Sequence, residues 1–244
     1  MTEMELRMKL VETAKSYLGC KESDGSHKQI IDIYNGHKPL AVGYALNYTT
    51  DSWCSAFVSA MSILCGMTDI LPTECGCERH VELFKKLGSF VEDDTYVPKV
   101  GDVVFYNWND DGKGDCTGRA NHIGIVTACD GKCITVIEGN INNAVGYRTI
   151  EVNGRYIRGF GIPKYELLAT EGDSSNQRSG RYYTLADLKA DKEFGGAYLP
   201  TIVKLIAKGY LKGKGGTGDG LILDLSEDSV RILVILDRAG NFDN

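Results

Sequence analysis

The chain lacks three features that would each indicate a particular class of protein. No stretch of its 244 residues is apolar over the length of a membrane span. Residues 1–9 carry charge, but no apolar segment of secretory length follows them, which predicts synthesis in a cytoplasm without a signal peptide. The net charge is −6, so there is no basic excess to attract nucleic acid. The remaining class is an ordinary globular protein.

Disulfides are also not expected, although the chain contains eight cysteines. A protein made in a cytoplasm keeps its thiols reduced, so these cysteines do not predict a disulfide framework. Cys75 and Cys77 are separated by one residue and lack the spacing of a zinc knuckle. Most of the cysteines are therefore expected to be small packing residues.

The sequence around Cys54 predicts a turn that leads into a buried helix. Asp51 and Ser52 are suitable N-cap residues, and apolar residues then recur at helical spacing, at positions 53, 57, 60 and 64. Cys54 would lie near the second helical position, where the helix dipole and free N–H groups favour a thiolate. A single cysteine at a helix start is usually a packing residue, so a nucleophile needs support from the rest of the chain.

That support comes from three segments that read as strands, at residues 101–106, 121–127 and 133–140. His122 opens the second strand, and Glu138 and Asn140 end the third. Because they are two residues apart, Glu138 and Asn140 are expected to project from the same face. Burying either one unpaired would be costly, which makes His122 the expected partner. A thiol, an imidazole and an orienting Glu or Asn form an activated nucleophile.

Four motifs in this order resemble the CHAP family: WCSAFV at 53–58, PKVGDVVF at 98–105, NHIGIV at 121–126 and IEGN at 137–140. Its members are cysteine, histidine-dependent amidohydrolases and peptidases with a papain-like fold that cut peptidoglycan, and the resemblance covers roughly residues 5 to 165. It implies Cys54 as nucleophile, His122 as general base and acid, Glu138 as the histidine-orienting group and Asn140 as a further polar site residue. Asn121 is a departure, because many relatives have Asp there.

The expected fold class is α+β, in two domains. Residues 1–168 would form a papain-like CHAP catalytic domain with N-terminal helices packed on an antiparallel sheet. Residues 169–181 read as a polar linker, and residues 182–244 as a small, mainly helical domain. Helices are predicted at 4–18, 29–34, 53–64, 78–88, 185–192, 198–208 and 226–239. The phase of the 78–88 helix places His80 on its exposed side, outside the site.

Further site residues are predicted from loops. Glu22, Tyr48 and Trp53 are candidate substrate contacts, with a surface loop or core packing as the alternative. The predicted chemistry requires no cofactor. Calcium is a candidate ligand of Asp110, Asp111 and Asp115, because oxygen donors alternate there around glycines. The alternative is an acidic hairpin tip, since the closing Glu of an EF-hand is missing.

The C-terminal segment weakly resembles a single S-layer-homology-like unit, which implies binding to a secondary wall polymer. A unit of this size gains stability by pairing, so a homodimer through it is a further expectation. A small helical cap on the catalytic domain is the alternative. Residues 181–244 carry nine basic and nine acidic side chains, so the charge deficit lies in the first 180 residues and does not attract anionic polymers.

Together these features predict an endolysin-like hydrolase of Gram-positive peptidoglycan. It would cleave an amide bond in the stem peptide, the cross-bridge or the sugar–peptide junction through a thioester. Synthesis without a signal predicts holin-type release of a phage enzyme, with a bacterial autolysin as the alternative. No nucleic-acid or membrane partner is expected. Two other functions stay open, a non-catalytic wall-binding protein and a cysteine amidase acting on a small intracellular substrate.

Overall fold

The computed structural model describes residues 1–110, 116–169, 181–192 and 195–242. The chain divides into two compact units, Met1–Glu171 and Gly172–Asn244, each with its own hydrophobic core. Within the described ranges, no helix is both long and apolar enough to cross a bilayer.

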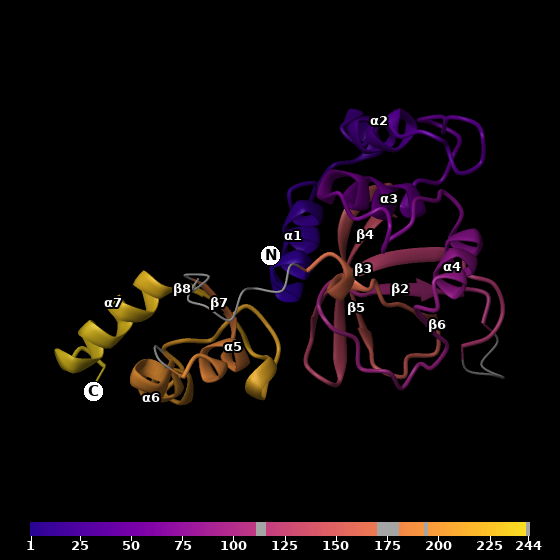
Figure 1. Cartoon of the computed structure of the whole chain (residues 1–244). Coiled ribbons are helices and arrows are strands. Elements are labelled where there is room, and N and C mark those ends of the chain that lie inside the picture. Colours follow the sequence, from indigo (N-terminus) through magenta and orange to yellow (C-terminus); the bar gives the residue numbers. More distant parts are fainter. Residues whose placement is uncertain (111–115, 170–180, 193–194, 243–244) are drawn as a thin grey trace. The chain divides into compact units, whose positions relative to one another are not determined.

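Four α-helices precede the main strands of the N-terminal unit (Figure 1): α1 (Glu3–Lys15), α2 (Lys28–Gly36), α3 (Cys54–Cys65) and α4 (Cys77–Lys86). Short 3-10 segments lie at Glu22–Asp24 and Tyr165–Leu167. A capping box starts α1, in which the Thr2 side chain accepts from the Glu5 N–H and the Glu5 carboxylate accepts from the Thr2 N–H. These helices lie close to their predicted positions.

One six-stranded sheet completes the unit, in the order β1-β6-β2-β3-β4-β5 with all neighbours antiparallel. Its strands are β1 (Phe90–Val91), β2 (Val103–Tyr106), β3 (His122–Cys129), β4 (Cys133–Ile141), β5 (Ala144–Glu151) and β6 (Ile157–Gly161). The three predicted strands are its centre, β2-β3-β4. The α+β prediction with an antiparallel sheet is therefore confirmed for this unit.

The two faces of the sheet serve two separate cores. Side chains such as Phe105, Ile123 and Ile137 pack with the helices in the larger core. Their neighbours along the strands, among them Tyr106 and Val136, form a smaller core on the other face. By strand alternation the His122 side chain belongs to this second face, because His122 is directly opposite Tyr106 in the β2–β3 register.

The PKVGDVVF motif has a structural role. Asp102 is completely buried and receives three hydrogen bonds, from the Arg7 guanidinium at 2.8 Å, the Tyr96 hydroxyl at 2.9 Å and the Lys99 N–H at 2.8 Å. Arg7 also lies over the ring of Tyr165, 4.5 Å from its centroid. A buried carboxylate is tolerated when it is paired in this way, and here it joins α1 to the sheet.

The C-terminal unit contains a feature that the sequence did not predict. Its helices α5 (Leu185–Ala190), α6 (Gly195–Ala207) and α7 (Glu227–Arg238) match the three expected ones. In addition, β7 (Arg181–Thr184) pairs with β8 (Ile222–Ser226), and a 3-10 turn lies at Gly218–Gly220. A short strand pair therefore accompanies the three expected helices, and Arg181 belongs to a strand rather than the linker. Residues 170–180 of the predicted linker lie outside the described residues.

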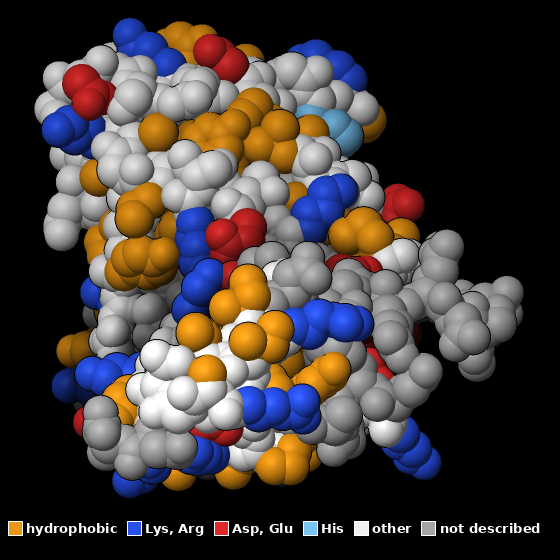
Figure 2. All heavy atoms as spheres, turned by 90° about the vertical axis from the view of Figure 1, so that its left-hand side faces the viewer, with side chains coloured by type: hydrophobic (Ala, Val, Ile, Leu, Met, Phe, Trp, Pro, Cys, Tyr) orange, Lys and Arg blue, Asp and Glu red, His pale blue; other side chains and the backbone are white. Residues whose placement is uncertain are grey.

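Local capping and a small core organise this unit. Thr184 caps α5 in a capping box with Asp187, and the Ser226 side chain accepts from the Ser229 N–H at the start of α7, as the sequence predicted. The core consists of Tyr182, Leu185, Leu188, Ile202, Leu223 and Val230. Other apolar side chains stay exposed, including Ile232 and Ile235 on α7, and Figure 2 shows hydrophobic side chains at the surface between Lys and Arg.

Candidate active site

Cys54 is the first residue of α3, and the helix it starts is almost entirely buried. The N-cap is Trp53, which makes no side-chain capping bond, so the predicted capping by Asp51 or Ser52 is wrong. Asp51 instead accepts from the Asn47 N–H. With no side-chain cap, the N–H groups of the first helical turn remain available to a negative charge beside Cys54.

His122 and Glu138 form a buried pair. The His122 Nε2 and Glu138 Oε2 atoms are 2.9 Å apart, and the Glu138 side chain is completely inaccessible to solvent. Arg148 on β5 donates from Nε to both carboxylate oxygens, at 2.8 and 3.0 Å. The hydrogen bonds from His122 and Arg148, together with the Tyr106 hydroxyl, outweigh burial and lower the pKa of Glu138. Glu138 is thus an ionised carboxylate between two cations.

The Cys54 thiol interacts with two groups. Its Sγ lies 3.5 Å from Cys77 Sγ, at the first residue of α4. The hydrogen bond from Cys77 and, against the effect of burial, the hydrogen bond and charge of His122 lower the pKa of Cys54 to about 5. The hydrogen bond to Cys54 and burial raise the pKa of Cys77 well above the usual value, so we assign Cys77 as the donor.

The pKa of the His122 imidazole is raised, whereas the pKa of Cys54 is lowered. Burial by itself would lower the pKa of His122, but the hydrogen bonds and charges of Cys54 and Glu138 outweigh it and raise the pKa to about 9. Between these two pKa values the stable state is a thiolate beside an imidazolium. The candidate nucleophile, Cys54, is therefore already ionised at neutral pH.

Two motif glycines leave space for this arrangement. A Cβ at Gly124 would lie 2.7 Å from the Glu138 Cγ, and a Cβ at Gly139 would lie 2.3 Å from the Phe57 Cβ. The glycine of NHIGIV therefore makes room for the carboxylate beside His122. The glycine of IEGN lets α3 approach β4 closely enough to bring Cys54 to the strand end.

Asn140 does not follow the predicted alternation. Its φ is +59° and the β4–β5 register shifts between Glu138 and Ile141. The expectation that Glu138 and Asn140 share a face rested on regular pleating, which is lost at this irregularity. The Asn140 Oδ1 atom is buried with no hydrogen-bond partner in the described part of the chain. It is thus a vacant acceptor two residues beyond Glu138 rather than part of the His122 pair.

The predicted substrate contacts have different positions. Trp53 is completely buried, so its ring is part of the core, which corrects its assignment as a substrate contact. Its Nε1 donates to the Glu22 carboxylate at 2.9 Å, which links the Glu22 loop to the start of α3. Tyr48 is 37% exposed and its hydroxyl donates to Asp32. Of the three, Tyr48 offers an accessible ring and Glu22 a partly exposed carboxylate.

His80 is completely buried, which corrects its predicted exposed position. Its Nδ1 lies 3.0 Å from the hydroxyl of Ser55, and its ring packs on Phe84 and Phe105. Burial lowers the pKa of His80 to about 4, against the weaker effect of the Glu74 charge. Periodicity failed here because the exposed side of an isolated helix is covered by α3.

One of the three predicted calcium ligands, Asp110, lies among the described residues. Asp111 and Asp115 lie outside the described residues. Asp110 is buried, its backbone oxygen accepts from Arg155 at 2.6 Å, and its carboxylate lies 4.0 Å from the Arg155 Nε. Over the described ranges, no group of three His, Cys, Asp or Glu side chains is arranged to hold a metal ion. The calcium site stays a prediction.

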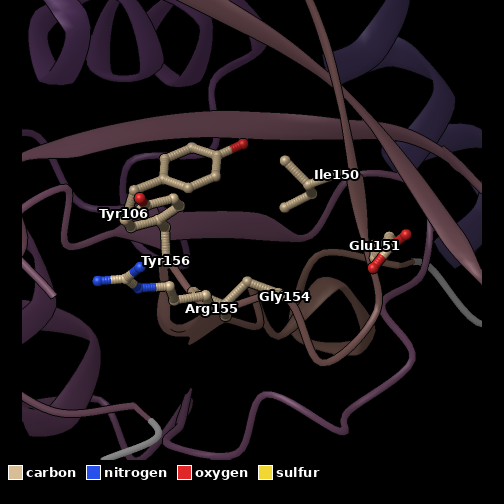
Figure 3. A pocket seen from close by; sticks show the side chains of 7 residues that line it. Tyr106, Ile150, Glu151, Gly154, Arg155 and Tyr156 are labelled. Carbon is tan, nitrogen blue, oxygen red and sulfur yellow. The ribbon is translucent and has the colours of Figure 1, made fainter. Parts of the chain in front are cut away.

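A pocket of about 250 Å³ lies against Tyr106 (Figure 3), lined by Tyr106, Ile150, Glu151, Gly154, Arg155, Tyr156 and Ile157. Tyr106 connects it indirectly to the site, since its ring centroid is 5.7 Å from that of His122. Neither Cys54 nor any predicted substrate contact lines the pocket, so it is separate from the thiol and its partners.

Sequence reasoning missed Arg148 and Cys77. Arg148 could have been found from Asn142-Asn143, a turn pair with positive φ at both residues that predicts a hairpin and hence β5. In the β4–β5 register Arg148 stands opposite Val136, diagonal to Glu138. No local signal marks Cys77, because α3 and α4 meet through tertiary packing. The departure at Asn121 is benign, since its Oδ1 accepts from the Trp108 N–H at 3.0 Å, as a carboxylate would.

Comparison with known proteins agrees with this geometry. No curated protein and no solved structure matches the chain significantly. A family model described as the CHAP domain matches residues 43–140, a range that includes Cys54, His122 and Glu138. CHAP domains in general are cysteine- and histidine-dependent amidohydrolases or peptidases that act on peptidoglycan. The match covers less than half of the chain and shows that this segment is similar to the CHAP domain.

Proposed function

We propose that this protein is a peptidoglycan hydrolase in which Cys54 attacks an amide carbonyl, with His122 and Glu138 as its catalytic partners. The observation that supports this most directly is the series Cys54, His122 and Glu138, with a thiolate at the start of α3 and a carboxylate 2.9 Å from the imidazole. In this order each group stabilises the charge of the next, as activation of a nucleophile requires.

The chemical steps follow from these positions. The Cys54 thiolate adds to the carbonyl carbon, and the oxyanion that forms is held by backbone N–H groups at the start of α3. His122 donates its proton to the leaving amine, and a thioester remains. His122, now neutral, takes a proton from water, whose oxygen attacks the thioester and releases the carboxylic acid and the thiolate.

Glu138 and its neighbours hold the imidazole through these steps. Glu138 accepts from Nε2, which fixes the tautomer and leaves Nδ1 for the thiol side. Arg148 binds both oxygens of that carboxylate and so fixes its orientation. Asn140 keeps the role of a further polar site residue, two residues beyond Glu138.

The biological setting is part of the proposal. An endolysin-like enzyme, made in the cytoplasm and released to act on Gram-positive peptidoglycan, combines this chemistry with an attachment unit. The second compact unit, Gly172–Asn244, would bind a secondary wall polymer or a second copy of the chain. Its own core and its exposed apolar side chains on α7 support an independent binding role.

The test is mass spectrometry of the products from purified Gram-positive peptidoglycan, digested by wild type and by Cys54→Ala. Free stem peptides with intact lactyl ends establish an amidase, and new termini inside the stem or bridge establish an endopeptidase. Cys54→Ala is expected to release neither. If wild type also leaves the wall intact while sedimenting with it, the protein binds the wall without cutting it, and the proposal is overturned.

A further inference from the structure

The contact between Cys54 and Cys77 has a consequence beyond catalysis. Their sulfur atoms are 3.5 Å apart, both side chains are buried, and each cysteine is the first residue of its helix. Cys75, two residues before Cys77, lies instead beside Arg79, whose Nη2 is 3.5 Å from its sulfur. The thiol facing the candidate nucleophile is therefore specifically that of Cys77.

We propose that Cys54 and Cys77 form a reversible disulfide when the protein meets a peroxide, and that this bond switches the hydrolase off. Formation of the bond requires only the two thiols and the peroxide, and it does not depend on hydrolase activity. The loss of activity rests on the proposed function, because it follows from removing the Cys54 nucleophile.

The chemistry balances with hydrogen peroxide as the oxidant. The Cys54 thiolate attacks one peroxide oxygen, the O–O bond breaks, and with one proton the products are a sulfenic acid on Cys54 and one water. The Cys77 sulfur then attacks the Cys54 sulfur, the S–O bond breaks, and the Cys77 proton leaves with the hydroxyl as a second water. Two electrons pass from the thiols to the peroxide, and a dithiol reductant returns them.

The surroundings favour this sequence over irreversible oxidation. A thiolate is the form of cysteine that peroxide oxidises, and the hydrogen bond from Cys77 together with the charge of His122 keeps Cys54 in that form. A disulfide needs sulfur atoms about 2.0 Å apart, so a small side-chain rotation closes the present gap.

The second cysteine also protects the first. A sulfenic acid with a thiol beside it forms a disulfide, whereas one without such a partner proceeds to sulfinic acid, which ordinary reductants do not reverse. Cys77 is thus placed as a resolving cysteine for the nucleophile. In the reduced state the same thiol donates a hydrogen bond to the Cys54 thiolate, so one side chain serves both states.

The experiment treats reduced full-length protein with hydrogen peroxide, blocks remaining thiols and maps peptides without reduction. We expect a cross-linked peptide pair containing Cys54 and Cys77, a loss of at least about tenfold in peptidoglycan cleavage, and recovery with dithiothreitol. In Cys77→Ser the cross-link is absent, Cys54 carries sulfinic acid, and dithiothreitol restores little activity. Cys75→Ser is the matched control and should behave as wild type.

Several results would overturn the proposal. A disulfide that joins other cysteines, such as Cys129 and Cys133, would do so, as would full recovery of oxidised Cys77→Ser by dithiothreitol. Should Cys77→Ser fail to fold by circular dichroism, the wild-type peptide map decides alone. A cross-link formed in a protein that never cuts peptidoglycan would contradict the proposed function and leave the disulfide intact, so the two failures are distinguishable.

Discussion

Two buried histidines of the N-terminal unit differ in charge at neutral pH: His122 is protonated and His80 is neutral. Both lie near a glutamate that an arginine also contacts. At His122, the Glu138 carboxylate accepts directly from the ring, and the pKa is raised to about 9. At His80, the neighbouring Glu74 is occupied by Arg79 and by two backbone N–H groups, and the pKa is lowered to about 4. Direct hydrogen bonds to two anionic groups, the Cys54 thiolate and the Glu138 carboxylate, rather than proximity to a carboxylate, decide the charge of His122.

The partners on the other side of each ring differ as well. His122 is hydrogen-bonded to the Cys54 thiol at the start of α3. His80 is hydrogen-bonded to the hydroxyl of the next residue, Ser55, which also donates to the Glu74 backbone oxygen. The Ser55–His80 pair has the composition of a nucleophile and base. Ser55 is completely buried, however, so no substrate reaches it, and the pair fixes α4 against α3.

The sharpest test of this comparison replaces each histidine. His122→Ala should reduce peptidoglycan cleavage by about 10³-fold or more, because the thiolate loses its counter-ion and the leaving amine its proton donor. His80→Gln, which can keep the hydrogen bond to Ser55, should change the rate by less than about twofold. Cleavage is followed by the turbidity of purified peptidoglycan. Comparable losses in two well-folded variants would remove the distinction between the sites.

Glu138→Gln should cost about 10²-fold in kcat, because an amide stabilises the imidazolium less than a carboxylate does. The free energy of unfolding should change less than the activity does. Denaturant titration beside the kinetic assay measures both quantities. A folded variant with the wild-type lytic rate would count against the orienting role of Glu138.

Arg148→Met should lower kcat by about tenfold, since Glu138 loses the cation that fixes both of its oxygens. Without that positive charge the carboxylate acts more strongly on His122, so the alkaline limb of the pH profile should move upward. Arg148→Lys should restore part of the rate. An unaltered pH profile together with a reduced rate would indicate a packing role for Arg148 instead.

The wild-type pH profile of kcat/KM should be bell-shaped. Activity rises as pH increases through about 5, where Cys54 loses its proton, and falls as pH increases through about 9, where His122 loses its own. Initial rates in buffers of constant ionic strength give the two limbs. A single ionisation near the pKa of an ordinary thiol would show that no ion pair forms before substrate binds.

A further effect is expected on stability rather than on activity. The folded-state pKa of His80 lies below its unfolded value, so the unfolded chain binds the proton more tightly and stability falls as pH decreases from about 6.5 toward 4. The full effect is about 3 kcal/mol by pH 4. In His80→Gln this part of the acid sensitivity should disappear. Urea unfolding at a series of pH values measures the free energy of unfolding. If this free energy depends on pH in the same way in wild type and His80→Gln, the assignment is contradicted.

Local patterns in the sequence identified much of this architecture. Apolar periodicity located the helices, and alternation located the three central strands, because both depend on neighbouring residues. The weaker strands β5 and β6 and the β7–β8 pair were missed, since short strands are stabilised chiefly by the partner beside them. The N-cap of α3 was misassigned by one or two residues, where good capping residues precede the true start.

The sequence by itself identified the candidate residues of the proposed chemistry: a thiol before a helical pattern, an imidazole opening a strand and a carboxylate closing the next. Tertiary structure decided which of the similar residues act together. It buried His80 and Trp53, placed Cys77 against Cys54 and set Arg148 behind Glu138. These contacts join segments far apart in the chain, and the charge of each group depends on distances of a few ångströms that no local pattern encodes.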